Sequence, residues 1–205
     1  MKPLIVAATR EEIASSIPFL ERVQIPFLIT GVGMTATAYS LGRYLALYKP
    51  DIVINVGIAG SFNKDFPLGT VVEITKDTFA ELGAEDGDSF LTLVQLGFGE
   101  STYTPKQYAG LDTGLPPCQG ITVNKVHGKE ASIEAVKSIF QNIQIETMEG
   151  AAVFYVCQQE NLPCLQIRAL SNYVEKRDKS TWNIPLSIKN LNIWIQSFLK
   201  KVLNP

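Results

Sequence analysis

The sequence predicts one α/β domain, in which short buried strands alternate with helices. Three observations indicate this fold: all-apolar runs of strand length, helical periodicity between several of them, and small or polar residues where the runs end. The chain has 205 residues, which fits one large domain better than two. We therefore expect residues 1–205 to form a single domain around a sheet that is buried on both faces.

Composition and charge narrow the class of protein. Hydrophobic residues make up 46% of the chain and charged residues 19%, which is enough for a packed core and is not typical of disorder. The net charge is −2 and no basic run is present, so no nucleic-acid partner is expected. The apolar run 4–8 is too short for a membrane span or a signal sequence. Cys118, Cys157 and Cys164 are typical of reduced core cysteines, which predicts a cytoplasmic protein.

The first predicted strand, residues 4–8, is followed by two carboxylates. Glu11 and Glu12 stand where the loop after a strand faces the ligand crevice of an open α/β sheet. Thr9, with Glu12 three positions later, also matches a capping box, which would explain Glu12 without any function. From these residues alone, both interpretations remain open.

Two glycine-rich segments follow the next two predicted strands. The strand 26–30 leads into Gly31–Ala36 and a helix over about 35–48, and the strand 52–56 leads into Gly57–Ser61. The first segment has the form of a dinucleotide fingerprint, but that motif needs an acidic residue at the end of the next strand, and none stands there. We expect both segments to be loops that line a crevice with backbone groups.

The middle of the chain is less regular. A strand is predicted at 69–74, whereas 77–119 has weak periodicity and is too long for a plain loop. We expect short strands there, in an excursion toward the substrate or toward another subunit. A strand at 120–124 and a helix at 129–140 follow. His127 lies between them without neighbouring ligand-type residues, so it is more often structural than catalytic, and no metal or cofactor is expected.

Two charged side chains of the last third lie in apolar surroundings. Glu149 opens a buried helix, where the helix dipole alone would stabilise a carboxylate. Arg168 lies inside the predicted strand 164–170 and is expected to need a carboxylate partner, with Glu12 and Glu149 as candidates. A closing helix is predicted over 185–203.

Three motifs, in order along the chain, resemble the purine nucleoside phosphorylase and nucleosidase superfamily. They are Asn55-Val-Gly-Ile-Ala-Gly60, Met148-Glu149-Gly-Ala-Ala152 and Arg168-Ala-Leu-Ser-Asn172. One such match would be weak, but three in order make chance a poor explanation. The resemblance implies a three-layer α/β/α sandwich with a central mixed sheet. It also implies a homo-oligomer (a dimer or a tetramer) and a hydrolase or phosphorylase that acts on a nucleoside.

Within this superfamily, the stretches Phe79–Asp86 and Ser171–Asp178, followed by Trp182, resemble the futalosine hydrolase branch. That resemblance implies hydrolysis of the N-glycosidic bond of futalosine, with release of hypoxanthine and dehypoxanthine futalosine in menaquinone biosynthesis. A methylthioadenosine/adenosylhomocysteine nucleosidase and a purine nucleoside phosphorylase are the alternatives within the superfamily. A non-catalytic module that binds purine nucleosides is the alternative of another class.

The resemblance also implies roles for individual residues. Glu12 would accept a proton from the attacking water, with Glu11 in its place if the register is shifted by one. Arg168 would orient Glu12 and the water. Glu149 would accept hydrogen bonds from the ribose hydroxyls, and Met148 would pack on the sugar. Further substrate contacts are expected from Ala59, Gly60, Val126 and Thr147.

Asn172 is the most informative departure from a related pattern. Methylthioadenosine nucleosidases have Asp at the corresponding place, where a carboxyl group can protonate N7 of adenine and accept from its 6-amino group. A 6-oxopurine presents an acceptor, O6, to which an amide NH2 can donate, while the amide carbonyl can accept from a protonated N7. Asn172 therefore favours hypoxanthine over adenine.

The choice between hydrolysis and phosphorolysis depends on a phosphate site. The glycine-rich segments carry no arginine, which leaves Arg10 and Arg43 as donors, and Glu12 would repel phosphate. Hydrolysis is therefore expected. Futalosine also carries an aryl carboxylate, for which a cation near an apolar wall is expected. The cations considered are Lys125, Lys129 and Arg177.

Overall fold

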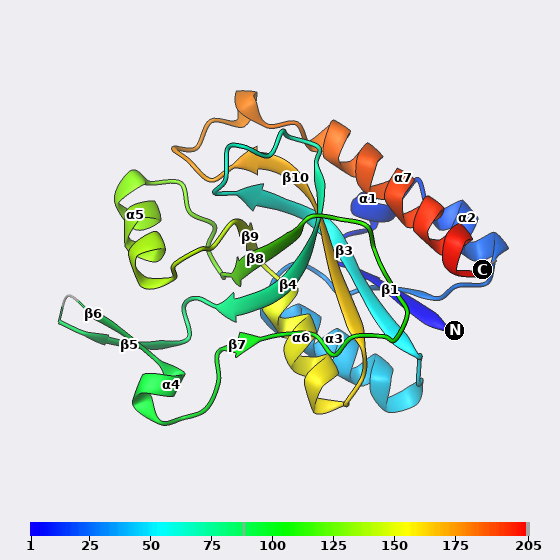
Figure 1. Ribbon diagram of the computed structural model, residues 1–205, viewed down its shortest axis with the longest axis horizontal. Helices are drawn as coiled ribbons and strands as arrows, with labels where there is room; N and C mark the ends of the chain where they lie inside the picture. The colour runs from blue at the N-terminus through cyan, green and yellow to red at the C-terminus, as the bar shows by residue number, and fades with distance from the viewer. Residues whose placement is uncertain (88, 204–205) are drawn as a thin grey trace.

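The computed structural model describes residues 1–87 and 89–203, which form one large mixed sheet with helices on both sides (Figure 1). The strand order is β10-β4-β8-β9-β3-β1-β2, and β7 is added beside β4. Because β10 pairs with β3 as well as with β4, these strands close into a ring with β8 and β9. The elements in chain order are β1 (Pro3–Ala7), α1 (Arg10–Ile13), α2 (Ile17–Arg22), β2 (Phe27–Ile29), α3 (Met34–Leu47), β3 (Ile52–Ser61), β4 (Val71–Phe79), β5 (Gly83–Asp86), β6 (Ser89–Thr92), α4 (Leu93–Leu96), β7 (Thr102–Tyr103), β8 (Pro117–Thr122), α5 (Glu130–Ile139), β9 (Ile145–Thr147), α6 (Gly150–Gln159), β10 (Cys164–Tyr173), the 3-10 turn η1 (Lys179–Thr181) and α7 (Ile184–Leu203).

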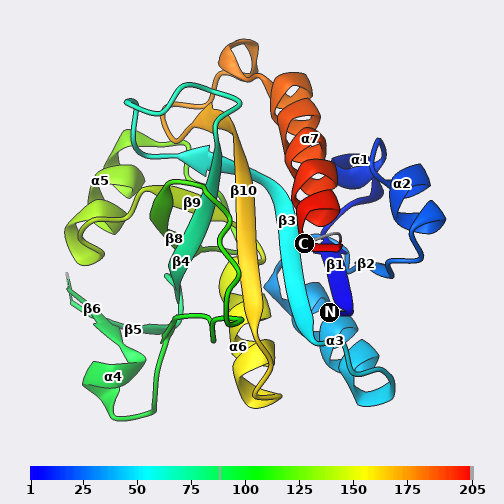
Figure 2. The same cartoon turned by 45° about the vertical axis from the view of Figure 1, so that its right-hand side comes forward.

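Alternate residues of each central strand pack into two different cores. In β1, Leu4 and Val6 belong to the core beneath α3 and α6, whereas Ile5 and Ala7 belong to the core beneath α1, α2 and α7. Figures 1 and 2 show α7, α1 and α2 together on one side of the sheet and α3 and α6 on the other. The strands are therefore buried on both faces, and the three-layer arrangement is confirmed.

The segment Gly57–Ser61 is the last half of β3, so the prediction of a loop there was wrong. β3 pairs in parallel with β10 along this half, which keeps the backbone extended. The glycine serves a close approach instead of a turn: a Cβ on Gly57 would lie 2.4 Å from Nη1 of Arg168 and 2.7 Å from Oε1 of Glu12. The other predicted glycine turn is present, since Gly31 and Gly33 have φ angles of 85° and 94°.

The segment 77–119 contains several short elements, as its weak periodicity indicates. Its first residues complete β4, and its last ones begin β8. Between them, β5 and β6 form a separate hairpin, which projects with α4 from the lower left of the molecule in Figure 1. The predicted strand 164–170 is also longer, because β10 continues to Tyr173 beside β3.

Two further observations concern possible membrane-spanning helices and the state of the cysteines. Among residues 1–87 and 89–203, no helix is both long enough and apolar enough to cross a membrane. The three cysteines are free and buried, as predicted: Cys118, Cys157 and Cys164.

Candidate active site

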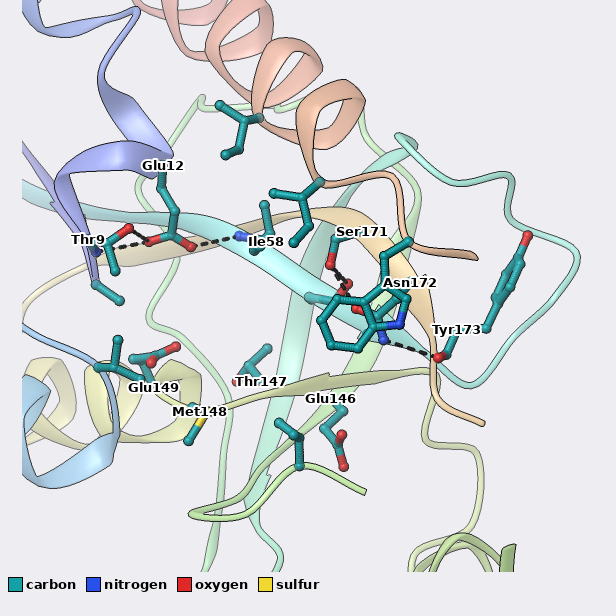
Figure 3. A pocket seen from close by; sticks show the side chains of 18 of the residues that line it. Thr9, Glu12, Ile58, Glu146, Thr147, Met148, Glu149, Ser171, Asn172 and Tyr173 are labelled. Carbon is teal, nitrogen blue, oxygen red and sulfur yellow. Dashed lines mark hydrogen bonds between the residues drawn. The ribbon is translucent and has the colours of Figure 1, made fainter. Parts of the chain in front are cut away.

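A cavity of about 490 Å³ opens at the carboxyl ends of β1, β3 and β10, which run parallel to one another. This is where an open α/β sheet commonly binds its ligand. α7 borders one side of the cavity, and the turn before α3 and the start of α6 border the other (Figure 3). Every site residue expected from the sequence lines it except Arg168: Glu12, Ala59, Gly60, Val126, Thr147, Met148, Glu149 and Asn172.

Glu12 is held at the cavity by two backbone amides, one for each carboxylate oxygen. Oε2 accepts from the N–H of Thr9 at 3.0 Å, and Oε1 accepts from the N–H of Ile58 at 2.9 Å. The predicted capping box is thus present, and the same carboxylate also reaches β3. Glu12 is 8% exposed, whereas its neighbour Glu11 is exposed. Oε2 also accepts from Oγ1 of Thr9 at 3.5 Å, so Oε1 is the oxygen that keeps a lone pair for a further donor such as a water.

Burial raises the pKa of Glu12 above the ordinary value of a glutamate, because a charged carboxylate loses solvation in the protein. Three smaller effects act in the opposite direction: the N–H groups of Ile58 and Thr9, and the positive charge of Arg168. The result is a carboxylate that takes up a proton more readily than an exposed one.

Glu149 lies across the cavity from Glu12 (Figure 3). It is the N-cap residue of α6, and its Oε1 accepts from the N–H of Gly33 at 2.9 Å. The side chain is therefore tied to the turn before α3, while the backbone of Glu149 opens α6. With 8% exposure, it presents a fixed acceptor to the cavity.

The prediction that Arg168 pairs with Glu12 or Glu149 was wrong for its direct contacts. Its Nε donates to Oε1 of Gln166 at 3.2 Å, and its Nη2 donates to Oδ1 of Asn55. Arg168 is 2% exposed and does not line the cavity, and its Nη1 lies beside Oε1 of Glu12 where a Cβ of Gly57 would be. Two amide oxygens accept from its Nε and Nη2, and its charge acts on Glu12 without a direct ion pair between them.

Sequence reasoning missed the anion that balances Arg168. Asp77 is fully buried, and its Oδ2 accepts from Nε2 of Gln166 at 3.0 Å while its Oδ1 accepts from Oγ1 of Thr122, also at 3.0 Å. Gln166 thus joins the two buried charges. Burial raises the pKa of Asp77 to about 6, although these hydrogen bonds and Arg168 oppose the shift. No local signal identifies this aspartate, because its partners are distant in the chain.

Asn172 follows a register shift between β10 and β3. Its Oδ1 accepts from Oγ of Ser171 at 2.8 Å, and its Nδ2 donates to the backbone oxygen of Tyr173 at 3.1 Å. An amide has two N–H bonds and two carbonyl lone pairs, so one donor and one acceptor remain for a ligand.

Several residues considered from the sequence stand elsewhere. Arg10, Arg43, Lys125 and Lys129 do not line the cavity. Arg177 lines it and lies over the ring of Trp182, with 4.9 Å between its Cζ and the ring centroid. Within the described residues, no three His, Cys, Asp or Glu side chains gather as metal ligands.

Comparison with known proteins identifies relatives of the whole fold. The sequence model of the phosphorylase superfamily matches residues 20–203. A futalosine hydrolase from Streptomyces coelicolor is 35% identical over 138 residues, which are 65% of this chain and 59% of that protein. A futalosine hydrolase from Acidothermus cellulolyticus is 31% identical over 176 residues, 80% of this chain and 70% of the relative. A 5'-methylthioadenosine/S-adenosylhomocysteine nucleosidase from Haemophilus influenzae is 28% identical over 84% of this chain and 80% of its own.

A solved structure gives the same fold. The futalosine hydrolase of Helicobacter pylori superimposes with a TM-score of 0.82 at 16% identity, over 98% of each chain. The solved structure shows the shared fold, and the match of the family model over residues 20–203 shows the family. The chain belongs to the phosphorylase superfamily, where its relatives include futalosine hydrolases and other nucleosidases.

Proposed function

We propose that residues 1–205 act as a single-domain nucleosidase that hydrolyses the N-glycosidic bond of futalosine, with release of hypoxanthine and dehypoxanthine futalosine. One observation carries the proposal: a buried carboxylate, Glu12, and an amide suited to a 6-oxopurine, Asn172, line the same cavity. The similarity to two futalosine hydrolases supports it. Because the aligned part spans only 59% of the first of them, the substrate is proposed here on the strength of the site.

The geometry suits attack by water on the anomeric carbon. Cleavage of an N-riboside passes through an oxocarbenium-like state, and the attacking water must lose a proton as it bonds. Glu12, with a raised pKa and a free lone pair on Oε1, is the acceptor of that proton. Arg168, on the same face of β3 as Glu12, stabilises the ionised form before the reaction. Glu149 accepts from the ribose hydroxyls, and Met148 packs on the sugar.

Water is favoured over phosphate as the nucleophile. A phosphate site requires arginine, lysine or several convergent amides near the anomeric carbon. Arg10 and Arg43, which were the candidates, lie outside the cavity lining. The two carboxylates Glu12 and Glu149 would instead repel a phosphate dianion.

Product analysis tests the proposal. Purified protein is incubated with futalosine, methylthioadenosine, adenosylhomocysteine or inosine, each with and without phosphate. We expect hypoxanthine from futalosine at the same rate in both conditions. Turnover that requires phosphate would identify a phosphorylase. Tight nucleoside binding in calorimetry, without turnover of any of the four, would identify a non-catalytic binding module.

The preference of the enzyme for a 6-oxopurine over a 6-aminopurine should change when Asn172 is substituted. Asn172→Asp is expected to lower kcat/KM for futalosine at least tenfold and to raise it for methylthioadenosine, because a carboxyl group suits a 6-amino group and repels O6. The ratio of the two kcat/KM values is the measurement, with Asn172→Ser as the control that removes the amide without adding a charge. An unchanged ratio would show that Asn172 does not read the base.

The pH dependence should reflect the burial of Glu12. Only the ionised carboxylate accepts a proton, so activity is present above the pKa of Glu12 and is lost as the pH falls through it. Because burial raises that pKa, the acidic limb of kcat/KM is expected at a higher pH than an exposed glutamate would give. A limb at the pH of an ordinary glutamate would contradict this role.

We also propose that the chain forms a homo-oligomer, a dimer or a tetramer, in the cytoplasm. Large apolar side chains are exposed near α3, α4 and α6, among them Tyr39 at 67%, Phe98 at 78% and Tyr155 at 41%. Phe98 and Tyr155 also border a second cavity, of about 660 Å³. Light scattering after gel filtration should give at least twice the chain mass, and Phe98→Asp should reduce it. A monomer at micromolar concentration would contradict the proposal. The proposed cytoplasmic location has separate support: the three cysteines are free and buried, which is typical of a protein from a reducing compartment.

A further inference from the structure

A histidine–carboxylate pair lines the part of the cavity remote from Glu12. Nδ1 of His127 is in hydrogen-bond contact with Oε2 of Glu146, and Oε1 of Glu146 accepts from the backbone N–H of His127 at 3.1 Å. The Glu146 side chain is 3% exposed and that of His127 is 14% exposed. Two contacts to one buried carboxylate therefore fix both the position of the ring and the nitrogen that faces Glu146. Figure 3 shows Glu146 at the opposite end of the cavity from Glu12.

The sheet register places this pair opposite Asn172. Gly60 of β3 pairs with Glu146 of β9 on one side and with Asn172 of β10 on the other. Side chains of paired residues point to the same face of a sheet, so Glu146 and Asn172 flank the position where a side chain of Gly60 would stand. A Cβ on Gly60 would lie 2.8 Å from Cγ2 of Val174 and 3.3 Å from Nδ2 of Asn172, so these side chains close on the glycine. His127, Glu146 and Asn172 all line the cavity, so a purine bound in it would lie between β9 and β10, which are roughly 10 Å apart, two strand spacings.

Hydrolysis needs a proton at this end of the cavity. When the C–N bond breaks, its electron pair stays with the purine, which leaves readily only if a ring nitrogen is protonated. Asn172 stands beside the purine in this arrangement, but an amide has no acidic proton to give. Glu12 takes a proton from water at the other end. A second proton-carrying group is therefore required.

The other ionisable groups of the lining are less suitable. Glu149 is bonded to Gly33 on the sugar side, and Glu11 stands beside Glu12 in α1. Glu175 forms an ion pair with Lys64 at 2.7 Å, the hydroxyl of Tyr173 donates to a backbone oxygen at 3.1 Å, and Arg177 does not release its proton. Nε2 of His127 makes no hydrogen bond with any residue that the structure describes. Every buried side-chain nitrogen of the described residues has a hydrogen-bond partner. Nε2 of His127 has none, so it is not buried and is accessible from the cavity.

We propose that His127, held by Glu146, is the acid that protonates the departing purine. The inference rests on the proposed hydrolysis and adds the source of its second proton. Nε2 of the imidazolium gives its proton to a ring nitrogen on the purine edge that faces β9, as the bond to the anomeric carbon breaks. Water bonds to that carbon and passes a proton to Glu12. Transfer of this proton from Glu12 to His127 through solvent restores the enzyme, and the net reaction consumes one water.

Glu146 has a positioning role in this scheme. Its carboxylate accepts from Nδ1–H in both states of the ring, which leaves Nε2 as the atom that gains and loses the proton. It also stabilises the positive charge of the imidazolium before the reaction. Asn172 orients the purine through O6, so the two sides of the base are held by residues with different tasks.

The test compares His127→Gln, His127→Ala and Glu146→Gln with the unmodified chain. Hypoxanthine release is measured at saturating futalosine, and thermal unfolding is recorded for each variant. We expect His127→Gln to lower kcat by about 100-fold or more while KM changes less than about threefold, since general acids contribute roughly 10²–10⁴-fold. Added imidazole should restore part of the activity of His127→Ala and none of that of Glu12→Gln. Lys129→Gln, in the same connection but outside the cavity, is the matched control.

The other outcomes each overturn the inference or its basis. A kcat within about threefold of the unmodified value in a folded His127→Gln variant would overturn it. A loss in both His127 variants that imidazole does not relieve would assign His127 a structural role. If the unmodified chain hydrolyses another nucleoside of the panel and not futalosine, the proposed substrate is wrong, and the same variants then show on that nucleoside whether His127 is the acid. If it releases no purine from any of them, the proposed function fails instead, which the assay of the unmodified chain reveals directly.

Discussion

Glu12→Gln is expected to lower kcat for hypoxanthine release by about 10²–10⁴-fold, because the amide cannot accept the proton of the attacking water. The variant keeps the shape of the side chain. Its carbonyl can accept from only one of the two backbone N–H groups, those of Thr9 and Ile58, that Glu12 now satisfies. The unmatched N–H costs about 1–3 kcal/mol, so the protein should still fold.

Steady-state kinetics and thermal unfolding are measured side by side for this variant. Glu21→Gln, at an exposed position of α2 outside the cavity lining, provides a control for the loss of one negative charge. Glu11→Gln separates the two neighbouring carboxylates. A larger loss in Glu11→Gln than in Glu12→Gln would move the base to Glu11, and full activity of Glu12→Gln would exclude it as the base.

Gly150→Ala is expected to have the largest effect on stability. A Cβ at this position would lie 2.1 Å from Oε1 of Gln166 and 2.2 Å from Oδ2 of Asp77, inside contact distance for any carbon. Both atoms are buried and belong to the hydrogen bonds that join Asp77 to Arg168. The side chains cannot withdraw without breaking those bonds. The overpacking should cost about 3 kcal/mol, which lowers the melting temperature by roughly 6–12 °C.

Urea denaturation measures this loss, and Gly42→Ala is the matched control. Gly42 lies within α3. Apart from its chain neighbours and the backbone of its own helix, no atom lies within 4 Å of a Cβ built there. Alanine should therefore stabilise the helix by about 0.5–1 kcal/mol. If Gly150→Ala were as stable as the unmodified chain, the hydrogen bonds around Asp77 would not be rigid.

The sequence was sufficient wherever a local pattern determines the structure. Apolar runs predict the central strands, and the spacing of Thr9 and Glu12 predicts the capping box, because both depend on residues that are close in the chain. The position of Asn172 at the end of its strand follows from the same patterns. These features define the end of the sheet at which the cavity lies.

Long-range contacts could not be predicted in this way. Gly57 was expected in a loop, but pairing with β10, more than one hundred residues later, keeps it extended. A buried arginine requires compensation, yet the choice of amide oxygens and a distant Asp77 over the nearby carboxylates depends on packing alone. The contact of His127 with Glu146 spans 19 residues and joins an irregular connection to the three-residue strand β9, and neither has a periodic signal in the sequence.

The position of β3 between β1 and β10 has a consequence for the growing chain. β1 is available as soon as β3 has been synthesised, but β10 begins at residue 164, whereas β3 ends at residue 61. At about 5–20 residues per second, ribosomes leave that edge of β3 uncovered for roughly 5–20 seconds. During this interval an apolar strand presents unpaired backbone groups to other nascent chains. Chaperone capture during translation should therefore depend more on the delay before β10 than on the final stability of the protein.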